Sequence, residues 1–177
     1  MAVKGRLHTL FSAEEIAGRI EAMAGAIARD LGPSFLAIPI LKGSFIFAAD
    51  LMRALHRAGA APEIDFLTLG SYGTGQVSGG TVRVVRDVEA PIAGAKVLLI
   101  DDILESGRTL AFAKDLMTAR EAQSVHVCVL LEKRGKLAVQ VAADYVGFDC
   151  PDRFVVGYGM DVAHAYRQLP YVGWIET

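Results

Sequence analysis

Apolar residues recur along the chain with two alternating spacings. From residue 16 to residue 31 they recur every three or four positions, which predicts an amphipathic helix. Ser12 and Glu15 stand before this pattern at the spacing of a capping box, and Gly32 follows it as a stop signal. Residues 35–41 are then an unbroken apolar run, which predicts a buried strand.

Strands and helices continue to alternate through the rest of the sequence. Several of the expected strands are apolar on both faces, which is typical of a parallel sheet covered by helices on both sides. No repeat or linker interrupts the pattern, so we expect one α/β domain over residues 1–177. The expected strands span residues 63–69, 81–87, 96–100, 124–131, 143–148 and 154–158, and the expected helices span 45–58, 109–120 and, as a short turn, 163–168.

Composition narrows the class of protein. Eighteen Lys and Arg stand against twenty Asp and Glu, and 53% of the 177 residues are hydrophobic. This excludes a disordered chain, and it provides no basic face for general nucleic-acid binding. Cys128 and Cys150 are too few for a disulfide framework and lack the spacing of a zinc site. Trp174, near the C-terminus, is interpreted as a structural anchor.

The position and length of the apolar runs indicate where the protein is located. The basic N-terminal residues precede no apolar run of the kind found in signal peptides. The longest apolar runs also fall far short of the ~18 residues that a membrane span needs. We therefore expect a cytoplasmic protein that binds neither a membrane nor nucleic acid.

One segment near the middle of the chain carries the strongest chemical signal. A buried strand ends in Asp101 and Asp102, and a short loop with Glu105, Ser106 and Gly107 leads into the next helix. In an open parallel sheet, ligands bind beyond the carboxyl ends of the strands. The N–H groups at a helix start, together with hydroxyls and a glycine, form a phosphate cradle.

The three carboxylates of this segment need a role of their own, because they would repel a phosphate. They could accept hydrogen bonds from sugar hydroxyls, or bind Mg²⁺ together with a pyrophosphate. The alternative is a polar turn whose acids only cap a helix, which the helix dipole also favours. Because loop, acids, glycine and hydroxyls occur together, we interpret the segment as a site for phosphate, sugar diol and metal.

The segment resembles the phosphoribosyl-pyrophosphate-binding motif of the type I phosphoribosyltransferases. That motif is an apolar strand, two acids, two apolar residues, an acid, Ser or Thr, Gly and a nearby Thr, and every part is present. Other segments look like signatures of the hypoxanthine-guanine phosphoribosyltransferase family and follow in that family's order. These are LKGS at 41–44, SYG at 71–73, LLEKR at 130–134, YVGF at 145–148, DRFVVGYGMD at 152–161 and Arg167.

The resemblance implies a fold and an activity. The fold would be that of the type I phosphoribosyltransferases, with a core at about residues 30–150 and a small hood built from the N- and C-terminal segments. The activity would be purine salvage, with Mg²⁺ as cofactor and with phosphoribosyl pyrophosphate and a 6-oxopurine base as substrates. Because the family is commonly dimeric or tetrameric, we expect a homodimer or homotetramer. The choice among hypoxanthine, guanine and xanthine stays open.

The resemblance also implies which residues bind the sugar and its phosphates. Asp101 and Asp102 match the acidic pair that contacts the ribose hydroxyls, directly or through Mg²⁺, and Asp161 matches a second metal contact. Arg167 matches a pyrophosphate-binding arginine. The 5′-phosphate loop corresponds to Glu105, Ser106, Gly107, Arg108 and Thr109, and the pyrophosphate loop, often with a non-proline cis peptide, to Leu41, Lys42 and Gly43.

Three residues match the purine site. Lys133 matches the lysine that donates to the purine 6-oxo group, Phe154 the stacking aromatic ring, and Val155 a backbone contact to the purine edge. Without the family, Lys133 would be interpreted as a surface lysine and Phe154 as a core residue. Ser71 and Tyr72 match the tip of a mobile loop that closes over the site, in agreement with the polar, glycine-rich composition of residues 70–80.

Glu105 departs from the family pattern. The family usually has Asp at this position, where the carboxylate manages the proton on purine N7, and Glu is one methylene longer. A misplacement of about 1 Å costs about 10²-fold in rate. We nevertheless interpret Glu105 as the group that accepts or relays this proton. Asp101 is also a departure, since the family usually has Glu there.

Two other functions share parts of this pattern. A non-catalytic regulator of the same fold would sense phosphoribosyl pyrophosphate and contact nucleic acid, but the net charge of -2 argues against the basic surface that it needs. A receiver-type phosphoacceptor also places an acid pair at a strand end. Receivers have that pair near the N-terminus, whereas here it is central and precedes a phosphate cradle.

Overall fold

A mixed sheet forms the centre of the computed structural model, which describes residues 5–71 and 81–176. Its strand order is β5-β4-β2-β6-β7-β8, and β3 pairs with β2 beside this path. The pairs are parallel except for β4 with β5, so the predicted parallel sheet is confirmed with one antiparallel edge strand. The strands are β2 (Leu36–Leu41), β3 (Glu63–Ile64), β4 (Leu67–Ser71), β5 (Val82–Arg86), β6 (Lys96–Leu104), β7 (Ser124–Glu132) and β8 (Tyr145–Asp149).

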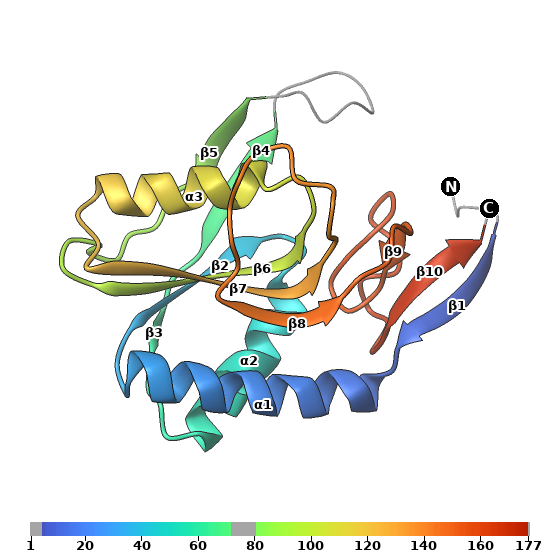
Figure 1. Ribbon diagram of the computed structural model, residues 1–177, viewed down its shortest axis with the longest axis horizontal. Coiled ribbons are helices and arrows are strands. Elements are labelled where there is room, and N and C mark those ends of the chain that lie inside the picture. Colours follow the sequence, from blue (N-terminus) through green and yellow to red (C-terminus); the bar gives the residue numbers. More distant parts are fainter. Residues whose placement is uncertain (1–4, 72–80, 177) are drawn as a thin grey trace.

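Helices cover both faces of this sheet (Figure 1). α1 (Ala13–Leu31) and α2 (Phe45–Arg57) lie on one face, and α3 (Arg108–Ala119) lies on the other. The predicted capping box is confirmed, because Ser12 and Glu15 each accept the other's backbone N–H.

The apolar strands supply two separate cores. In β6, Leu98 and Ile100 are buried in the cluster that includes α1 and α2, whereas Val97 and Leu99 are buried in the cluster that includes α3. This alternation is what a strand buried on both faces requires.

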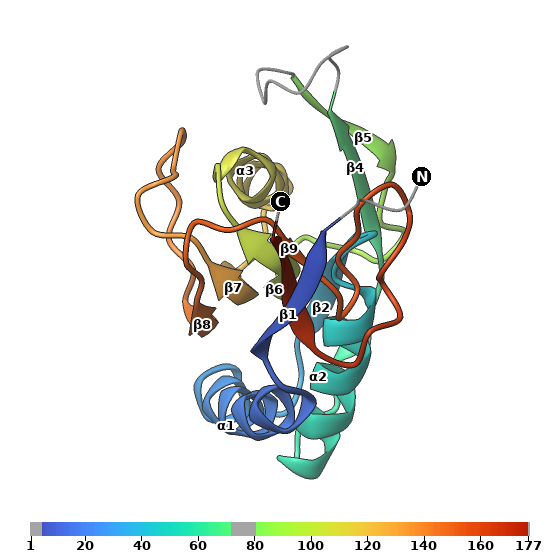
Figure 2. The same ribbon diagram turned by 90° about the vertical axis from the view of Figure 1, so that its right-hand side faces the viewer.

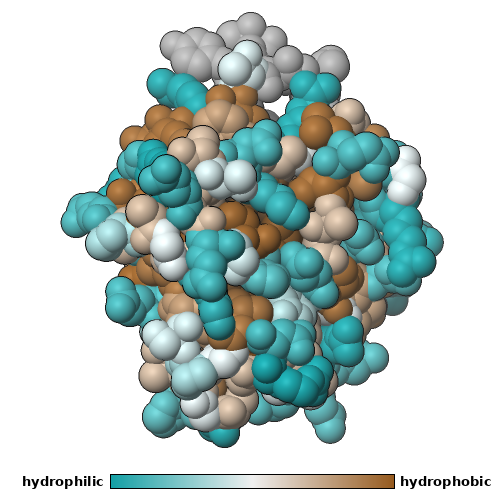
Figure 3. Space-filling view, turned by 60° about the vertical axis from the view of Figure 1, so that its left-hand side comes forward, coloured by the Kyte–Doolittle hydropathy of each residue, from teal (hydrophilic) through white to brown (hydrophobic). Residues whose placement is uncertain are grey.

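On the face shown in Figure 3, hydrophilic residues cover most of the surface and hydrophobic ones show in smaller patches between them.

The two ends of the chain meet in a second, smaller sheet. β1 (Arg6–Phe11), β10 (Val172–Glu176) and β9 (Val155–Val156) are antiparallel in the order β1-β10-β9. Figure 1 shows this sheet beyond the arrowheads of β7 and β8, at the carboxyl ends of the central strands, and Figure 2 shows its strands side by side. It corresponds to the hood that the resemblance implied.

Four expected elements differ from the structure. The strand expected at 154–158 is reduced to the two residues of β9, since Gly157 and Tyr158 have positive φ. Residues 63–69 form two strands, because the Asp65 carboxylate accepts the N–H groups of Phe66, Glu89 and Ala90 and interrupts the ladder. The expected helical turn at 163–168 is wrong, since several residues there have positive φ. β6 does not end before the acid pair but continues to Leu104.

The length and composition of the described helices bear on whether they could span a membrane. None of them combines the length and the apolar character that crossing a membrane requires.

Candidate active site

A cavity of about 270 Å³ opens at the carboxyl ends of β2 and β6. It brings together three segments that are far apart in the sequence: the turn after β2, the end of β6 and the loop that starts α3. Most of the residues predicted for the sugar phosphate line it, namely Leu41, Lys42, Gly43, Asp101, Asp102, Glu105, Ser106, Gly107 and Thr109.

The turn after β2 approaches the acid pair closely. The peptide between Leu41 and Lys42 is cis, as the resemblance implied. A side chain on Gly43 would begin 1.8 Å from Oδ2 of Asp102, so any larger residue here would displace the Asp102 carboxylate. The buried Ser44 hydroxyl donates to the carbonyl of Ile40 at 2.6 Å and holds the two ends of the turn together.

The two aspartates lie within β6, side by side at the cavity. Asp101 is buried and Asp102 is partly buried. Burial raises the pKa of both carboxyls, and the charge of Asp102 raises the pKa of Asp101 further. Arg167 acts on Asp102 in the opposite direction. A cation placed between the carboxylates and a substrate oxygen would relieve the cost of two buried negative charges.

The loop before α3 has the form of a phosphate cradle. Gly107 has φ 79° and is the N-cap of α3, where the helix N–H groups are free to bind an anion. The N–H groups of Ala138 and Val139, from the connection between β7 and β8, both donate to the Ser106 carbonyl. Among the described residues, only Arg108 has a buried side-chain nitrogen, Nε, without a hydrogen-bond partner.

Lys133 is at the end of β7, next to this loop. Its residue exposure is 6%, and its ammonium lies 3.0 Å from a carboxylate oxygen of Glu105. Glu105 is the exposed member of the pair, with 47% of its side chain accessible. Without the family resemblance, Lys133 would be interpreted as a surface lysine. Its burial shows that this interpretation is wrong.

The segment after β8 supplies the remaining predicted residues. Phe154 is 58% exposed, and the neighbouring Val155 is buried in β9. Arg167 donates to the Gly159 carbonyl at 2.6 Å and forms an ion pair with Asp161 at 2.7 Å. These residues do not line the cavity described above.

Comparison with known proteins identifies this arrangement. The sequence model of the phosphoribosyl transferase domain matches residues 8–163. The chain belongs to this family. It is 39% identical to the hypoxanthine-guanine phosphoribosyltransferase of Dictyostelium discoideum over 94% of each chain. It is 37% identical to the hypoxanthine phosphoribosyltransferase of Escherichia coli strain K12, over 97% of this chain and 96% of that protein.

Solved structures agree with the fold. The crystal structure of a hypoxanthine-guanine phosphoribosyltransferase from Bacillus anthracis is similar with a TM-score of 0.90 and 37% identity, covering 98% of this chain and all of that one. The predicted type I phosphoribosyltransferase fold, a central sheet flanked by helices with a small hood, is confirmed. The family resemblance found in the sequence is confirmed as well.

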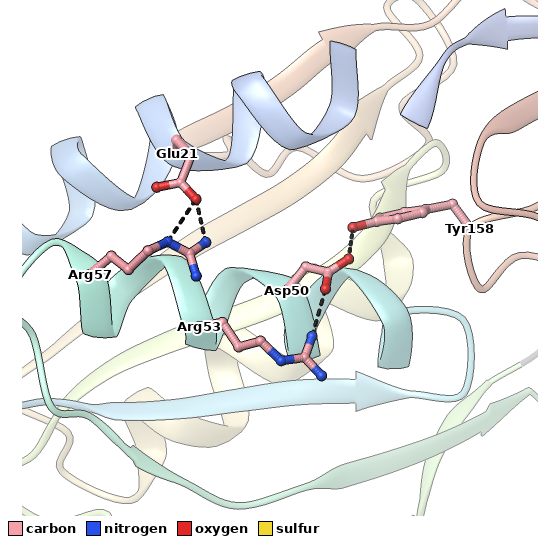
Figure 4. A network of polar contacts seen from close by, with 5 residues as sticks. All are labelled: Glu21, Asp50, Arg53, Arg57 and Tyr158. Atoms are coloured by element: carbon pink, nitrogen blue, oxygen red, sulfur yellow. Dashed lines mark hydrogen bonds and ion pairs between the residues drawn. The ribbon is translucent and has the colours of Figure 1, made fainter. Parts of the chain in front are cut away.

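A polar network in this phosphoribosyltransferase joins the hood to α1 and α2, and sequence reasoning did not find it (Figure 4). The Tyr158 hydroxyl donates to Asp50 on α2 at 2.5 Å, and Arg53 donates to the other oxygen of Asp50 at 2.7 Å. Arg57 pairs with Glu21 of α1. No spacing in the sequence relates residues 108 positions apart, so only the fold reveals the Asp50–Tyr158 contact.

One predicted part of the phosphoribosyltransferase site cannot be compared with the structure. Tyr72 lies outside the described residues, as does most of the glycine-rich stretch, and Ser71 is the last residue of β4. The prediction of a closing loop at these positions stays a prediction.

Proposed function

We propose that the protein transfers the phosphoribosyl group of phosphoribosyl pyrophosphate to N9 of hypoxanthine or guanine in purine salvage, giving IMP or GMP and pyrophosphate. The observation that carries the proposal is the buried Lys133 ammonium beside a phosphate cradle. A fixed buried donor suits a base with an acceptor oxygen at C6 and disfavours an amino group. The relatives described above are named for hypoxanthine, or for hypoxanthine and guanine, which supports the same substrates.

The cavity offers a place for each anionic part of the sugar phosphate. The 5′-phosphate would bind the N–H groups and hydroxyls of the loop from Glu105 to Thr109, of which Arg108 is the first residue of α3. The pyrophosphate would bind the backbone of the Leu41–Gly43 turn together with Arg167. The oriented backbone amides, together with Arg108 and Arg167, therefore compensate for the negative charge of phosphoribosyl pyrophosphate. The chain as a whole nevertheless has a net charge of -2.

The acid pair suits Mg²⁺. Neither Asp101 nor Asp102 forms an ion pair in the part of the chain that the structure describes, and both are oxygen donors facing the cavity. Mg²⁺ in proteins keeps several waters and takes one or two carboxylates plus substrate oxygens. Among residues 5–71 and 81–176, no group of three or more His, Cys, Asp or Glu side chains is placed to hold a metal ion by itself. Bound Mg²⁺ would screen the charge of the departing pyrophosphate.

The residues of the chain would then act on the sugar and the base. As the bond from C1 to the pyrophosphate oxygen breaks and the bond to N9 forms, positive charge develops on the ribose ring. Asp101, Asp102 and Glu105 stabilise that charge. The purine O6 attracts the Lys133 ammonium, which frees the Glu105 carboxylate to accept the N7 proton.

Other residues hold the substrates in position. The exposed Phe154 ring would stack on the purine, and the Val155 backbone would contact its edge. Asp161, which is paired with Arg167, would provide a second metal contact near the pyrophosphate. Ser71 and Tyr72 would belong to a loop that closes over the site and excludes water. A cytoplasmic homodimer or homotetramer without nucleic-acid or membrane partners completes the proposal.

Steady-state assays test this function. Purified protein with phosphoribosyl pyrophosphate and Mg²⁺ is expected to convert hypoxanthine, guanine or both into nucleotides, and the rates also measure the preference among these bases and xanthine. Absence of nucleotide formation with all three bases would contradict the proposal. Salt-sensitive binding of RNA by a protein without turnover would instead support the regulator of the same fold.

A further inference from the structure

Trp174, the single tryptophan of the chain, contacts two other planar side chains. The guanidinium carbon of Arg153 is 3.9 Å from the centre of the indole ring. On β1, the His8 ring stacks on the indole with centroids 4.6 Å apart and planes inclined by 15°, and His8 also bonds to Glu176 at 2.8 Å. A cation and two aromatic rings in this order attract one another through cation–π and stacking interactions.

The small sheet places this stack beside the segment proposed to bind the purine. His8 pairs with Trp174, and Trp174 pairs with Val155, so the three residues form one row across β1, β10 and β9. Figure 2 shows these three strands next to one another. Arg153 comes two residues before Val155, and its backbone N–H donates to the Pro151 carbonyl at 2.7 Å. Trp174 is therefore linked to the residues on both sides of Phe154, through its indole to Arg153 and through backbone pairing to Val155.

We propose that Trp174 and Arg153 are positioning residues for the purine base. The inference rests on the proposed function, in which Phe154 stacks on the purine and Val155 offers its backbone. Phe154 directly precedes β9, so the pairing of Val155 with Trp174 restrains the backbone immediately after Phe154. The Phe154 ring is 58% exposed and has little packing of its own to fix its direction. The stack fixes the backbone on either side of it and hence the angle of the ring.

A purely structural anchor would have a different signature. If Trp174 only holds the small sheet on the domain, its loss lowers stability and affects both substrates alike. If the stack sets the angle of the Phe154 ring, its loss weakens base binding and leaves binding of phosphoribosyl pyrophosphate unchanged. The ratio of the two KM values distinguishes these cases.

The main test variant is Arg153→Ala, because Arg153 is exposed and its removal leaves no buried cavity. We expect the KM for hypoxanthine or guanine to rise about fivefold, with kcat and the KM for phosphoribosyl pyrophosphate changed by less than about twofold. Trp174→Ala should raise the base KM about tenfold, and Trp174→Phe should restore most of the loss. Arg29→Ala, which removes another exposed arginine, in α1, is the matched control.

The single tryptophan also gives a direct binding signal. GMP is expected to change the fluorescence emission of Trp174 in a saturable way. The dissociation constant for GMP should be about fivefold larger for Arg153→Ala than for the native chain. Unchanged base KM and unchanged GMP binding in Arg153→Ala overturn the inference, and so does an equal rise in both KM values. Failure of the proposed function is distinct, since it appears as a native protein that turns over no 6-oxopurine.

Discussion

The Lys133 ammonium lies 3.0 Å from the Glu105 carboxylate, at the point where the end of β7 meets the phosphate loop. The pair is asymmetric, because Lys133 is buried whereas 47% of the Glu105 side chain is accessible to solvent. The donor proposed for purine O6 and the acceptor proposed for the N7 proton thus hold each other before a base arrives. In the proposed function, purine binding would replace the Glu105 partner of Lys133 with the purine O6.

This asymmetry predicts different effects for the two ends of the pair. Glu105→Ala leaves a buried ammonium without its carboxylate and should lower the free energy of unfolding by about 1–3 kcal/mol. Lys133→Met leaves a carboxylate that water can solvate, and should cost less stability. Urea denaturation of both variants measures the difference, and a larger loss for Lys133→Met would contradict it.

The same pair predicts a separation of kinetic effects. Glu105→Gln keeps the size of the side chain but cannot accept a proton, so kcat should fall by about 10²-fold or more. Lys133→Met should mainly raise the KM for the base, since it removes the donor to O6. Glu105→Asp tests the extra methylene directly: if its kcat equals that of the native chain, the backbone tolerates either length.

Gly43 and Gly107 are predicted to be essential for steric reasons. A β-carbon on Gly43 would lie 1.8 Å from Asp102, and one on Gly107 would lie 2.5 Å from the Val139 carbonyl in a left-handed backbone. Alanine at either position should displace the sugar-phosphate site and reduce kcat/KM for phosphoribosyl pyrophosphate by about 10²-fold. Gly18→Ala is the matched control, because nothing lies within 4 Å of its added carbon in α1. It should keep full activity and gain about 0.5–1 kcal/mol in stability.

Tyr158→Phe tests the network between the hood and α2. The variant removes the hydroxyl that donates to Asp50, while Asp50 keeps its ion pair with Arg53. We expect a loss of about 1 kcal/mol in the free energy of unfolding. We also expect a higher KM for phosphoribosyl pyrophosphate, because the Tyr158 segment continues into Asp161. Unchanged stability together with an unchanged KM would show that the contact has no positioning role.

Asp65 predicts a pH dependence of stability. Burial alone would raise the pKa of its carboxyl, but N–H donors from Ala90, Phe66 and Glu89 bring it below the usual value. A carboxyl whose pKa is lower in the folded than in the unfolded chain stabilises the fold above about pH 4. That stabilisation disappears as the pH falls through the folded pKa.

Asp65→Asn should therefore lower the free energy of unfolding by about 1–2 kcal/mol at neutral pH. Its curve of stability against pH should approach that of the native chain in acid. Urea denaturation at a series of pH values measures both curves. Asp115→Asn, at an exposed position of α3, is the control, and an equal offset at every pH would contradict the assignment.

Much of the fold could be predicted because the apolar pattern and the packing agree. α1 begins at its capping box, and β6 and β7 are buried runs, as their composition indicated. The interruption at Asp65 could not be predicted, since it depends on N–H groups from residues 89 and 90. The positive-φ turns at 163–166 have no local signal either, because non-glycine residues adopt them under tertiary constraint.

The site was predictable where its residues are consecutive. The segment from Asp101 to Thr109 carries its chemistry in one motif, and the structure brings those residues to one cavity. Lys133 and Arg167 were assigned only through the family, because a single lysine or arginine has no pattern. The Arg153–Trp174–His8 stack depends on the pairing of three strands from both ends of the chain, which the sequence alone does not specify.

β6 continues through the acid pair and remains in register with β7, up to Leu104 beside Glu132. The next residue of the β7 chain, Lys133, donates its N–H to the Leu104 carbonyl. The residues proposed for the ribose and for the base thus belong to two adjacent strands, about 4.8 Å apart in the direction of the hydrogen bonds, and Lys133 lies three residues beyond the position level with Asp102. If these residues act as proposed, sheet geometry sets the separation between sugar and base, and insertions in the connecting loops would alter access to the site without altering that separation.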